Sequence, residues 1–124
     1  MDDIVEITEG HTKLLVPNSS LEGNAPPKQP AFFNPRAKLS RDFSIVAYAA
    51  FLENFKGPKT FLDCLAGIGA RSIRVANELD MIEKVFANDV NPDALALGIR
   101  SAKLNNTCKC EFSENEACRF LSLH

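Results

Sequence analysis

Short apolar runs and stretches of helical periodicity alternate along the second half of the chain. The runs at 60–65, 84–89 and 108–112 are predicted strands, and 70–79, 92–105 and 114–123 are predicted helices. The pair Asn91–Pro92 predicts the start of the second of these helices, because asparagine caps a helix and proline fits its first turn. In the last strand, Cys108, Cys110 and Phe112 are predicted to share one face. Strands that alternate with helices predict a parallel α/β sheet with right-handed connections.

A different pattern precedes these units. Residues 7–17 alternate enough to predict one or two short strands, and the composition of residues 18–30 is typical of a loop. Apolar positions then recur at helical spacing and predict a helix over 43–55, which Gly57–Pro58 ends. We therefore expect two parts, with residues 1–30 as N-terminal strands and loop and 31–124 as a truncated α/β domain. The last predicted strand would leave an open edge, which indicates that part of the sheet lies outside this chain.

Composition narrows the class of protein. With 124 residues, of which 45% are hydrophobic and 24% charged, the chain is expected to form one globular domain. Neither a signal or transit peptide nor a membrane span is visible, which favours a cytoplasmic protein without a membrane partner and leaves nucleus or mitochondrion open for a eukaryotic version. The four cysteines form no CxxC pair and have no histidine nearby, so no metal site is expected.

Net charge argues against binding nucleic acid by bulk charge alone. The formal net charge is -2 and the pI is near 5.7. Residues 28–41 nevertheless contain four basic residues and no acid. This segment is either a small basic patch or a solvated loop.

The candidate chemistry begins at the turn after the first strand of the α/β part. There, Asp63 is followed by Gly67 and Gly69, whose missing Cβ atoms let the backbone bend sharply and approach a ligand. The helix behind the turn offers free N–H groups. Ser72 stands at the third position of the dinucleotide fingerprint, where glycine or alanine is usual, so the turn alone is a weak signal.

Acidic residues are also predicted at the ends of the next two strands. Asp89 follows the second strand, where a carboxylate can accept hydrogen bonds from both hydroxyls of a ribose; the alternative is an ordinary turn aspartate. Near the end of the third strand, Glu116 could accept the adenine amino group while the amide of Ala117 donates to a ring nitrogen, although helix starts attract acids anyway. This acidic rim, without a P-loop lysine, suits an adenosine ligand of positive charge. S-adenosylmethionine is therefore favoured over a dinucleotide, and a methyltransferase over an oxidoreductase.

A family resemblance sharpens this hypothesis. The segments EGHTKLLVP, FFNPRAKLSRD, DCLAGIGARSIR, ANDVNPDA and NEA together resemble the N-terminal part of the tRNA (guanine-26 N2)-dimethyltransferase family. The resemblance implies a Rossmann-like class I methyltransferase sheet, here incomplete with about three βα units. It also implies that Arg36, Arg71, Asp89, Glu116 and Ala117 contact S-adenosylmethionine, the two arginines at its methionine end. Phe33 and Asn34 would line the pocket of the target guanine, with core packing as the alternative for Phe33.

The resemblance also implies what the chain lacks. The family's Asp-Pro-Phe-Gly motif does not occur, so no catalytic residue is assigned, and Phe33, Ala37 and Glu116 replace the family's usual tyrosine, methionine and aspartate. We expect the chain to be an N-terminal portion that is inactive alone, with tRNA and the missing C-terminal portion as partners. The alternatives are a non-catalytic adenosine-binding module and one half of a split protein.

Overall fold

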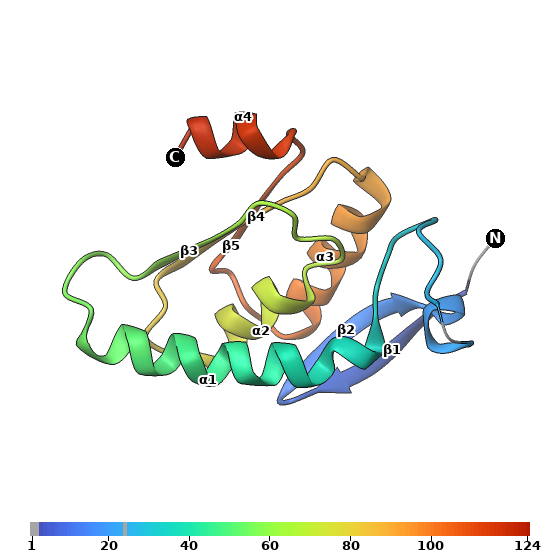
Figure 1. Ribbon diagram of the computed structural model, residues 1–124, viewed down its shortest axis with the longest axis horizontal. Helices are drawn as coiled ribbons and strands as arrows, with labels where there is room; N and C mark the ends of the chain where they lie inside the picture. The colour runs from blue at the N-terminus through green and yellow to red at the C-terminus, as the bar shows by residue number, and fades with distance from the viewer. Residues whose placement is uncertain (1–2, 24) are drawn as a thin grey trace.

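The computed structural model describes residues 3–23 and 25–124 and contains a three-stranded parallel sheet (Figure 1). The strands β3 (Thr60–Asp63), β4 (Lys84–Asn88) and β5 (Cys110–Ser113) lie in the order β3–β4–β5. Helix α2 (Ala70–Glu78) connects β3 to β4, and α3 (Pro92–Leu104) connects β4 to β5. The α/β fold with a parallel sheet is therefore confirmed.

Helices cover the two faces of the sheet unequally. On one face, side chains of α2 and α3 such as Ile73 and Leu97 form a buried cluster with Ile68 from the turn between β3 and α2. Of the helices in the described part of the chain, the short α4 (Ala117–Ser122) alone lies on the other face, where the ring of Phe86 is 4.6 Å from that of His124 (Figure 1). The second face is therefore the more exposed one.

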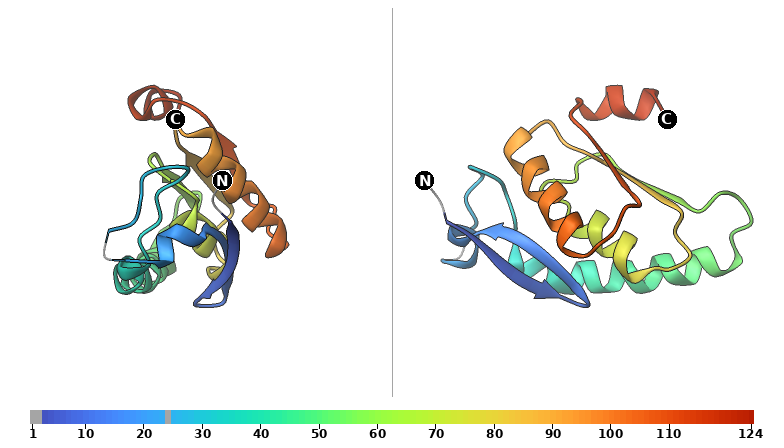
Figure 2. Two further views of the ribbon diagram at one scale, coloured as in Figure 1. Left: turned by 90° about the vertical axis from the view of Figure 1, so that its right-hand side faces the viewer. Right: turned by 180° about the vertical axis from the view of Figure 1, so that it is seen from behind.

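An antiparallel hairpin, β1 (Ile4–Glu9) and β2 (Thr12–Pro17), packs against the α2 and α3 side of the molecule (Figure 2). Leu14 and Val16 of β2 are fully buried in the same cluster as the side chains of α2 and α3. The backbone N–H of Leu15 donates to Ser101 Oγ of α3 at 2.9 Å. The hairpin therefore belongs to the core that supports the sheet.

Helix α1 (Lys38–Asn54) begins at Lys38 and not at Phe43 as its periodicity predicted. A short 3-10 helix, η2 (Pro35–Ala37), leads directly into it. Asn34 Oδ1 caps η2 by accepting the backbone N–H of Arg36 at 3.0 Å, and Pro35 follows at the first position. Asn34–Pro35 is thus the same kind of start signal as Asn91–Pro92.

Two further boundaries differ from the prediction near the C-terminus. Strand β5 begins at Cys110, so Cys108 lies before it and is exposed, whereas Cys110 and Phe112 pack against the core from one face. Helix α4 covers only 117–122 of the predicted 114–123. Its start is set by Glu116, whose side chain accepts from the first turn of the helix.

The described residues contain neither a metal-ligand cluster nor a helix suited to a membrane. All four cysteines are free. Within 3–23 and 25–124, no three His, Cys, Asp or Glu side chains gather as metal ligands. No helix in these ranges combines the length and apolar character needed to cross a bilayer.

Candidate functional site

The carboxyl ends of the three parallel strands are joined by one buried side chain, that of Asn88. Its Nδ2 donates to the carbonyls of Cys64 at 3.2 Å and Asn115 at 2.8 Å. Its Oδ1 accepts from Ser113 Oγ at 2.8 Å and from the backbone N–H of Asn115 at 3.0 Å. Asn88 thus fixes the segments after β3 and β5 to the end of β4. Sequence analysis missed this residue, because only the strand order shows what a strand-end asparagine can reach.

The turn between β3 and α2 depends on its two glycines. Gly67 and Gly69 have φ values of 58° and 82°, the left-handed region that favours glycine. A Cβ at Gly69 would also lie 3.1 Å from Ile73 Cδ1. The turn is closed by a hydrogen bond of 2.9 Å from the backbone N–H of Gly69 to the carbonyl of Ala66.

Asp89 links this turn to the next strand. One carboxylate oxygen accepts the backbone N–H of Gly67 at 2.8 Å, and the other accepts that of Asn91 at 2.9 Å. The side chain therefore has the position expected for a ribose acceptor and also that of a turn aspartate. A carboxylate has about four acceptor sites, so two stay available on a group whose orientation is already fixed.

Asp63, the last residue of β3, is held by the helix that follows it. Ser72 Oγ, fully buried in α2, donates to Asp63 Oδ2 at 2.6 Å. Burial raises the pKa of the Asp63 carboxyl, and the nearby charge of Asp89 adds to the rise. The Ser72 hydrogen bond and the charge of Arg71 oppose this effect. In the sequence, Ser72 only weakened the dinucleotide hypothesis. In the structure, its hydroxyl group holds the Asp63 carboxylate at the end of β3.

Arg71 lies near Asp63 with part of its hydrogen-bonding capacity unused. Its Nε is buried and has no hydrogen-bond partner within the described part of the chain. A buried guanidinium N–H without an acceptor costs free energy, so such a group is a natural place for a ligand acceptor.

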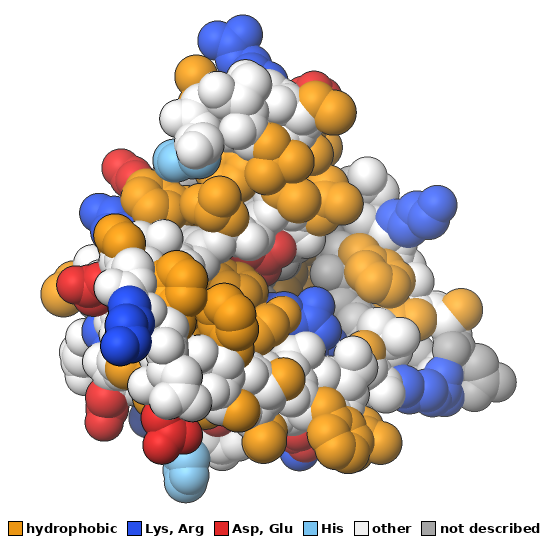
Figure 3. Space-filling model, turned by 60° about the vertical axis from the view of Figure 1, so that its left-hand side comes forward, with side chains coloured by type: hydrophobic (Ala, Val, Ile, Leu, Met, Phe, Trp, Pro, Cys, Tyr) orange, Lys and Arg blue, Asp and Glu red, His pale blue; other side chains and the backbone are white. Residues whose placement is uncertain are grey.

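Asp63, Gly67 and Arg71 line a cleft of about 270 Å³ between the turn and the segment that precedes α1. Phe32, Phe33 and Asn34 line it from that segment. The space-filling view shows a hollow with acidic and basic side chains amid hydrophobic ones (Figure 3). The cleft therefore combines opposite charges with apolar and aromatic walls.

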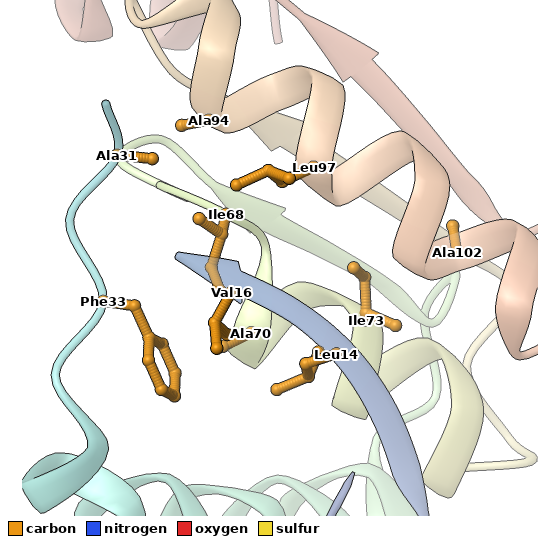
Figure 4. Packing of buried hydrophobic residues seen from close by; sticks show 10 residues of the cluster. All are labelled: Leu14, Val16, Ala31, Phe33, Ile68, Ala70, Ile73, Ala94, Leu97 and Ala102. Atoms are coloured by element: carbon orange, nitrogen blue, oxygen red, sulfur yellow. The ribbon is translucent and has the colours of Figure 1, made fainter. Parts of the chain in front are cut away.

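The two phenylalanines of the cleft differ in exposure. Phe33 is 3% exposed and points inward with Val16, Ile68 and Ala70, as Figure 4 shows. Its neighbour Phe32 is 51% exposed. Phe33 therefore has a packing role in addition to any contact with a ligand, and Phe32, which sequence analysis did not single out, offers the more accessible ring.

The predicted site residues that do not line this cleft are Gly69, Asp89, Arg36, Glu116 and Ala117. Arg36 is exposed, with Nη2 donating to the Gly23 carbonyl at 3.2 Å. Glu116 is exposed, and its carboxylate accepts the backbone N–H groups of Cys118 at 2.9 Å and Arg119 at 3.3 Å. These hydrogen bonds lower the pKa of Glu116. As the first residue of α4, Ala117 has an N–H that the helix itself does not use.

A buried ion cluster lies against one wall of the cleft. Arg41 of α1 donates to both carboxylate oxygens of Glu9 at 2.6 and 2.9 Å, and Arg74 of α2 donates to Glu9 at 3.0 Å. Arg41 also donates to the Asn34 carbonyl at 3.1 Å and lies 4.8 Å from the centre of the Phe33 ring. Burial alone would raise the pKa of Glu9, but Arg41 and then Arg74 hold it below the usual range.

Comparison with known proteins adds an independent line of evidence. Residues 10–124 match the family described as N2,N2-dimethylguanosine tRNA methyltransferase. The tRNA (guanine(26)-N(2))-dimethyltransferase of Methanopyrus kandleri is 41% identical over 108 residues, which are 85% of this chain and 26% of the relative. That of Methanococcus maripaludis strain C7 is 40% identical over 120 residues, 94% of this chain and 31% of the relative.

A solved structure shows the same arrangement of elements. Trm1 from Pyrococcus horikoshii, solved in complex with S-adenosyl-L-methionine, has a TM-score of 0.72 and 29% sequence identity. The likeness covers 96% of this chain and 32% of that one. The chain thus spans about a quarter to a third of the length of the relatives it matches.

Proposed function

The chain belongs to the N2,N2-dimethylguanosine tRNA methyltransferase family, and we propose that it forms the S-adenosylmethionine-binding portion of a tRNA (guanine-26 N2)-dimethyltransferase. The methyl acceptor is then the exocyclic N2 of a guanine in tRNA. Because the relatives are three to four times longer, transfer itself is proposed for the whole protein, with the proton acceptor outside the described residues. Residues 31–124 would be the first part of its methyltransferase domain.

The observation that carries this proposal is the joint fixation of the glycine turn and Asp89. The hydrogen bond from the Gly67 N–H to Asp89 brings a close-approach turn and a carboxylate from successive strands together. In α/β sheets, this crevice at the carboxyl ends of the strands is where nucleotide-like ligands bind. Gly67 and Gly69 would let the backbone approach the ligand, while Asp89 would accept from the ribose hydroxyls.

The cleft residues also fit the charges of the cofactor. The unpartnered Nε of Arg71 supports a contact with the methionine carboxylate, and Asp63 beside it would attract the ammonium group. When bound, S-adenosylmethionine supplies the methyl group from its sulfonium centre. The chain would hold donor and acceptor in line and exclude water from the reacting atoms.

The remaining assigned residues have supporting roles in the proposal. Phe33 and Asn34 would shape the guanine side of the cleft, and the exposed ring of Phe32 is the better group for stacking on an unstacked base. Ala117 would donate its free N–H to the adenine ring and Glu116 would accept the amino group. Arg36, on the exposed segment before α1, would reach the methionine end only by leaving the Gly23 carbonyl.

Titration calorimetry of S-adenosylmethionine against the chain tests the proposal. We expect Asp89→Ala to weaken binding about ten- to a hundredfold, because hydrogen bonds to a charged group are lost. Asp80→Ala, an exposed aspartate before β4, is the matched control and should leave the affinity unchanged. Equal affinities for the two variants, or no heat with the unaltered chain, would contradict the assignment.

A further inference from the structure

Every hydrogen-bonding position of the Asn88 side chain is occupied. An asparagine amide offers two N–H donors and two acceptor lone pairs. In Asn88 both donors are directed at carbonyls, those of Cys64 and Asn115. The oxygen accepts from Ser113 Oγ and from the N–H of Asn115. Because the side chain is fully buried, each of these bonds is costly to lose.

These bonds connect the ends of all three parallel strands. Cys64 follows β3 and Asn115 follows β5, so one side chain of the central strand reaches both of its neighbours. The main chain of Asn88 strengthens the connection to β3, since its carbonyl accepts the N–H of Ala66 at 2.8 Å. Neighbouring strands lie about 4.8 Å apart, so the two outer strands are separated by about 10 Å. The spacing of the segments that follow them is therefore set through Asn88.

The segment after β5 is held by Asn88 at the residue just before the proposed adenine contacts. Asn115 is bound at both its N–H and its carbonyl, and Glu116 and Ala117 follow directly. Glu116 keeps about two acceptor sites beyond the two helix N–H groups that it caps. Its acceptors and the N–H of Ala117 match the amino group and the ring nitrogen of adenine. Hypoxanthine has the reverse pattern and would face acceptor with acceptor and donor with donor.

We propose that Asn88 is a positioning residue that sets the base selectivity of the cofactor site. It holds the adenine-binding segment at a fixed distance from the glycine turn and from Asp89, which would hold the ribose. A ligand then meets donor and acceptor groups that are already in place, so ordering them does not reduce its affinity. Asn88 itself does not contact the ligand. The inference rests on the proposed function, because it takes adenosine to bind along the strand ends.

A purely structural role for Asn88 leads to a different expectation. Buried polar networks also make a fold rigid without any part in binding. Loss of such a role would lower the free energy of unfolding, but it would leave the choice of base unchanged in the molecules that stay folded. The ratio of the affinities for two ligands that differ only in the base therefore separates the two roles.

Calorimetric titration with S-adenosylhomocysteine and S-inosylhomocysteine measures this ratio. The second compound contains hypoxanthine, with a carbonyl and a ring N–H in place of the amino group and the ring nitrogen of adenine. We expect the unaltered chain to prefer the adenosine compound by at least about tenfold, because the reversed groups leave the polar atoms of the site unpaired. Asn88→Asp keeps the size of the side chain but loses both donors, and should reduce this preference to about threefold or less.

Two further variants complete the design. Asn106→Asp is the matched control, since it makes the same change at an exposed asparagine before β5 and should keep the full preference. Ser113→Ala removes one of the four bonds and keeps Asn88, and it should lower the preference by about two- to threefold. It provides the test if Asn88→Asp does not melt cooperatively.

The outcomes separate this inference from the proposed function. An unchanged preference in cooperatively folded Asn88→Asp, or in Ser113→Ala where that variant does not fold, would overturn the inference while cofactor binding stands. Absence of binding by the unaltered chain would overturn the proposed function and the inference together. Equal affinities of the unaltered chain for the two compounds would remove the adenine contacts, and the selectivity assigned to Asn88 with them.

Discussion

At the scale of single residues, Asp63 shows how the surroundings of a strand end change the pKa of a carboxyl group. The carboxyl is half-buried at the end of β3, and its partial burial raises its pKa despite the Ser72 hydrogen bond and the Arg71 charge. Its ionised form is thus less stable than that of an exposed aspartate. A bound ammonium group would reverse this balance, because an opposite charge nearby favours the ionised form.

We predict that S-adenosylmethionine binding weakens as pH falls through the raised pKa of Asp63. Between about pH 4.5 and 7 the ligand's own amino and carboxyl groups keep their charges, so the change reports the protein. Because the folded chain holds this proton more tightly than the unfolded chain, Asp63 lowers the free energy of unfolding as pH rises from the ordinary pKa of an aspartate to its raised pKa in the folded chain. Calorimetric titrations across this range should show a flatter profile for Asp63→Asn; an unchanged profile would exclude Asp63 as the titrating group.

The positions of site residues could be predicted from the sequence where backbone geometry demanded a residue type. Gly67, with its positive φ, and Asp89, directly after a strand, were identifiable from spacing alone. Asn88 and Ser72 could not be identified in this way, because asparagine and serine have many roles in proteins. Their hydrogen-bond partners lie 24 and 9 residues away in the sequence, respectively. Phe32 and Phe33 could not be ranked either, since the sequence does not show which ring faces the core.

At the scale of elements, the ion cluster of Glu9, Arg41 and Arg74 joins the hairpin, α1 and α2. Arg41 also holds the Asn34 carbonyl, so the segment that lines the cleft is fixed through the same side chain. The motif at 32–42 ends in the pair Arg41–Asp42. The hydrogen bonds of Arg41 give this residue a structural role. Sequence analysis counted Arg41 only as part of a basic segment, because its acidic partner lies 32 residues earlier, in β1.

We predict that Arg41→Ala lowers the free energy of unfolding by about 3–5 kcal/mol, because Glu9 loses its bidentate partner while it stays buried. Lys38→Ala is the matched control, since Lys38 forms an exposed ion pair with Asp42 on the same helix and should leave the urea midpoint nearly unchanged. Urea unfolding followed by circular dichroism measures both. Similar midpoints for the two variants would show that the buried cluster does not stabilise the fold.

The start of α1 shows why element boundaries are harder to predict than element types. The hydrophobic period of 43–55 indicated a helix, but four of the residues 38–42 are charged or polar, and Leu39 alone does not establish a period. Asn34 caps the preceding 3-10 helix η2, which leads into them, and Arg41 pairs with Glu9 of β1. Tertiary contacts thus extended an element beyond its own periodic signal.

At the scale of the whole molecule, the three parallel strands bring their following segments to one edge of the sheet. The carboxyl ends of β3, β4 and β5 form the proposed cofactor rim there. The parallel sheet could be predicted from the alternation of strands and helices.

The segments after three successive strands are proposed to act together on one ligand. This joint action can be measured from the amide chemical shifts of the isotope-labelled chain while S-adenosylmethionine is added. We expect Gly67, Gly69, Asp89 and Ala117 to respond together, with one common dissociation constant. Shifts confined to one of these segments, or centred on another surface, would contradict it.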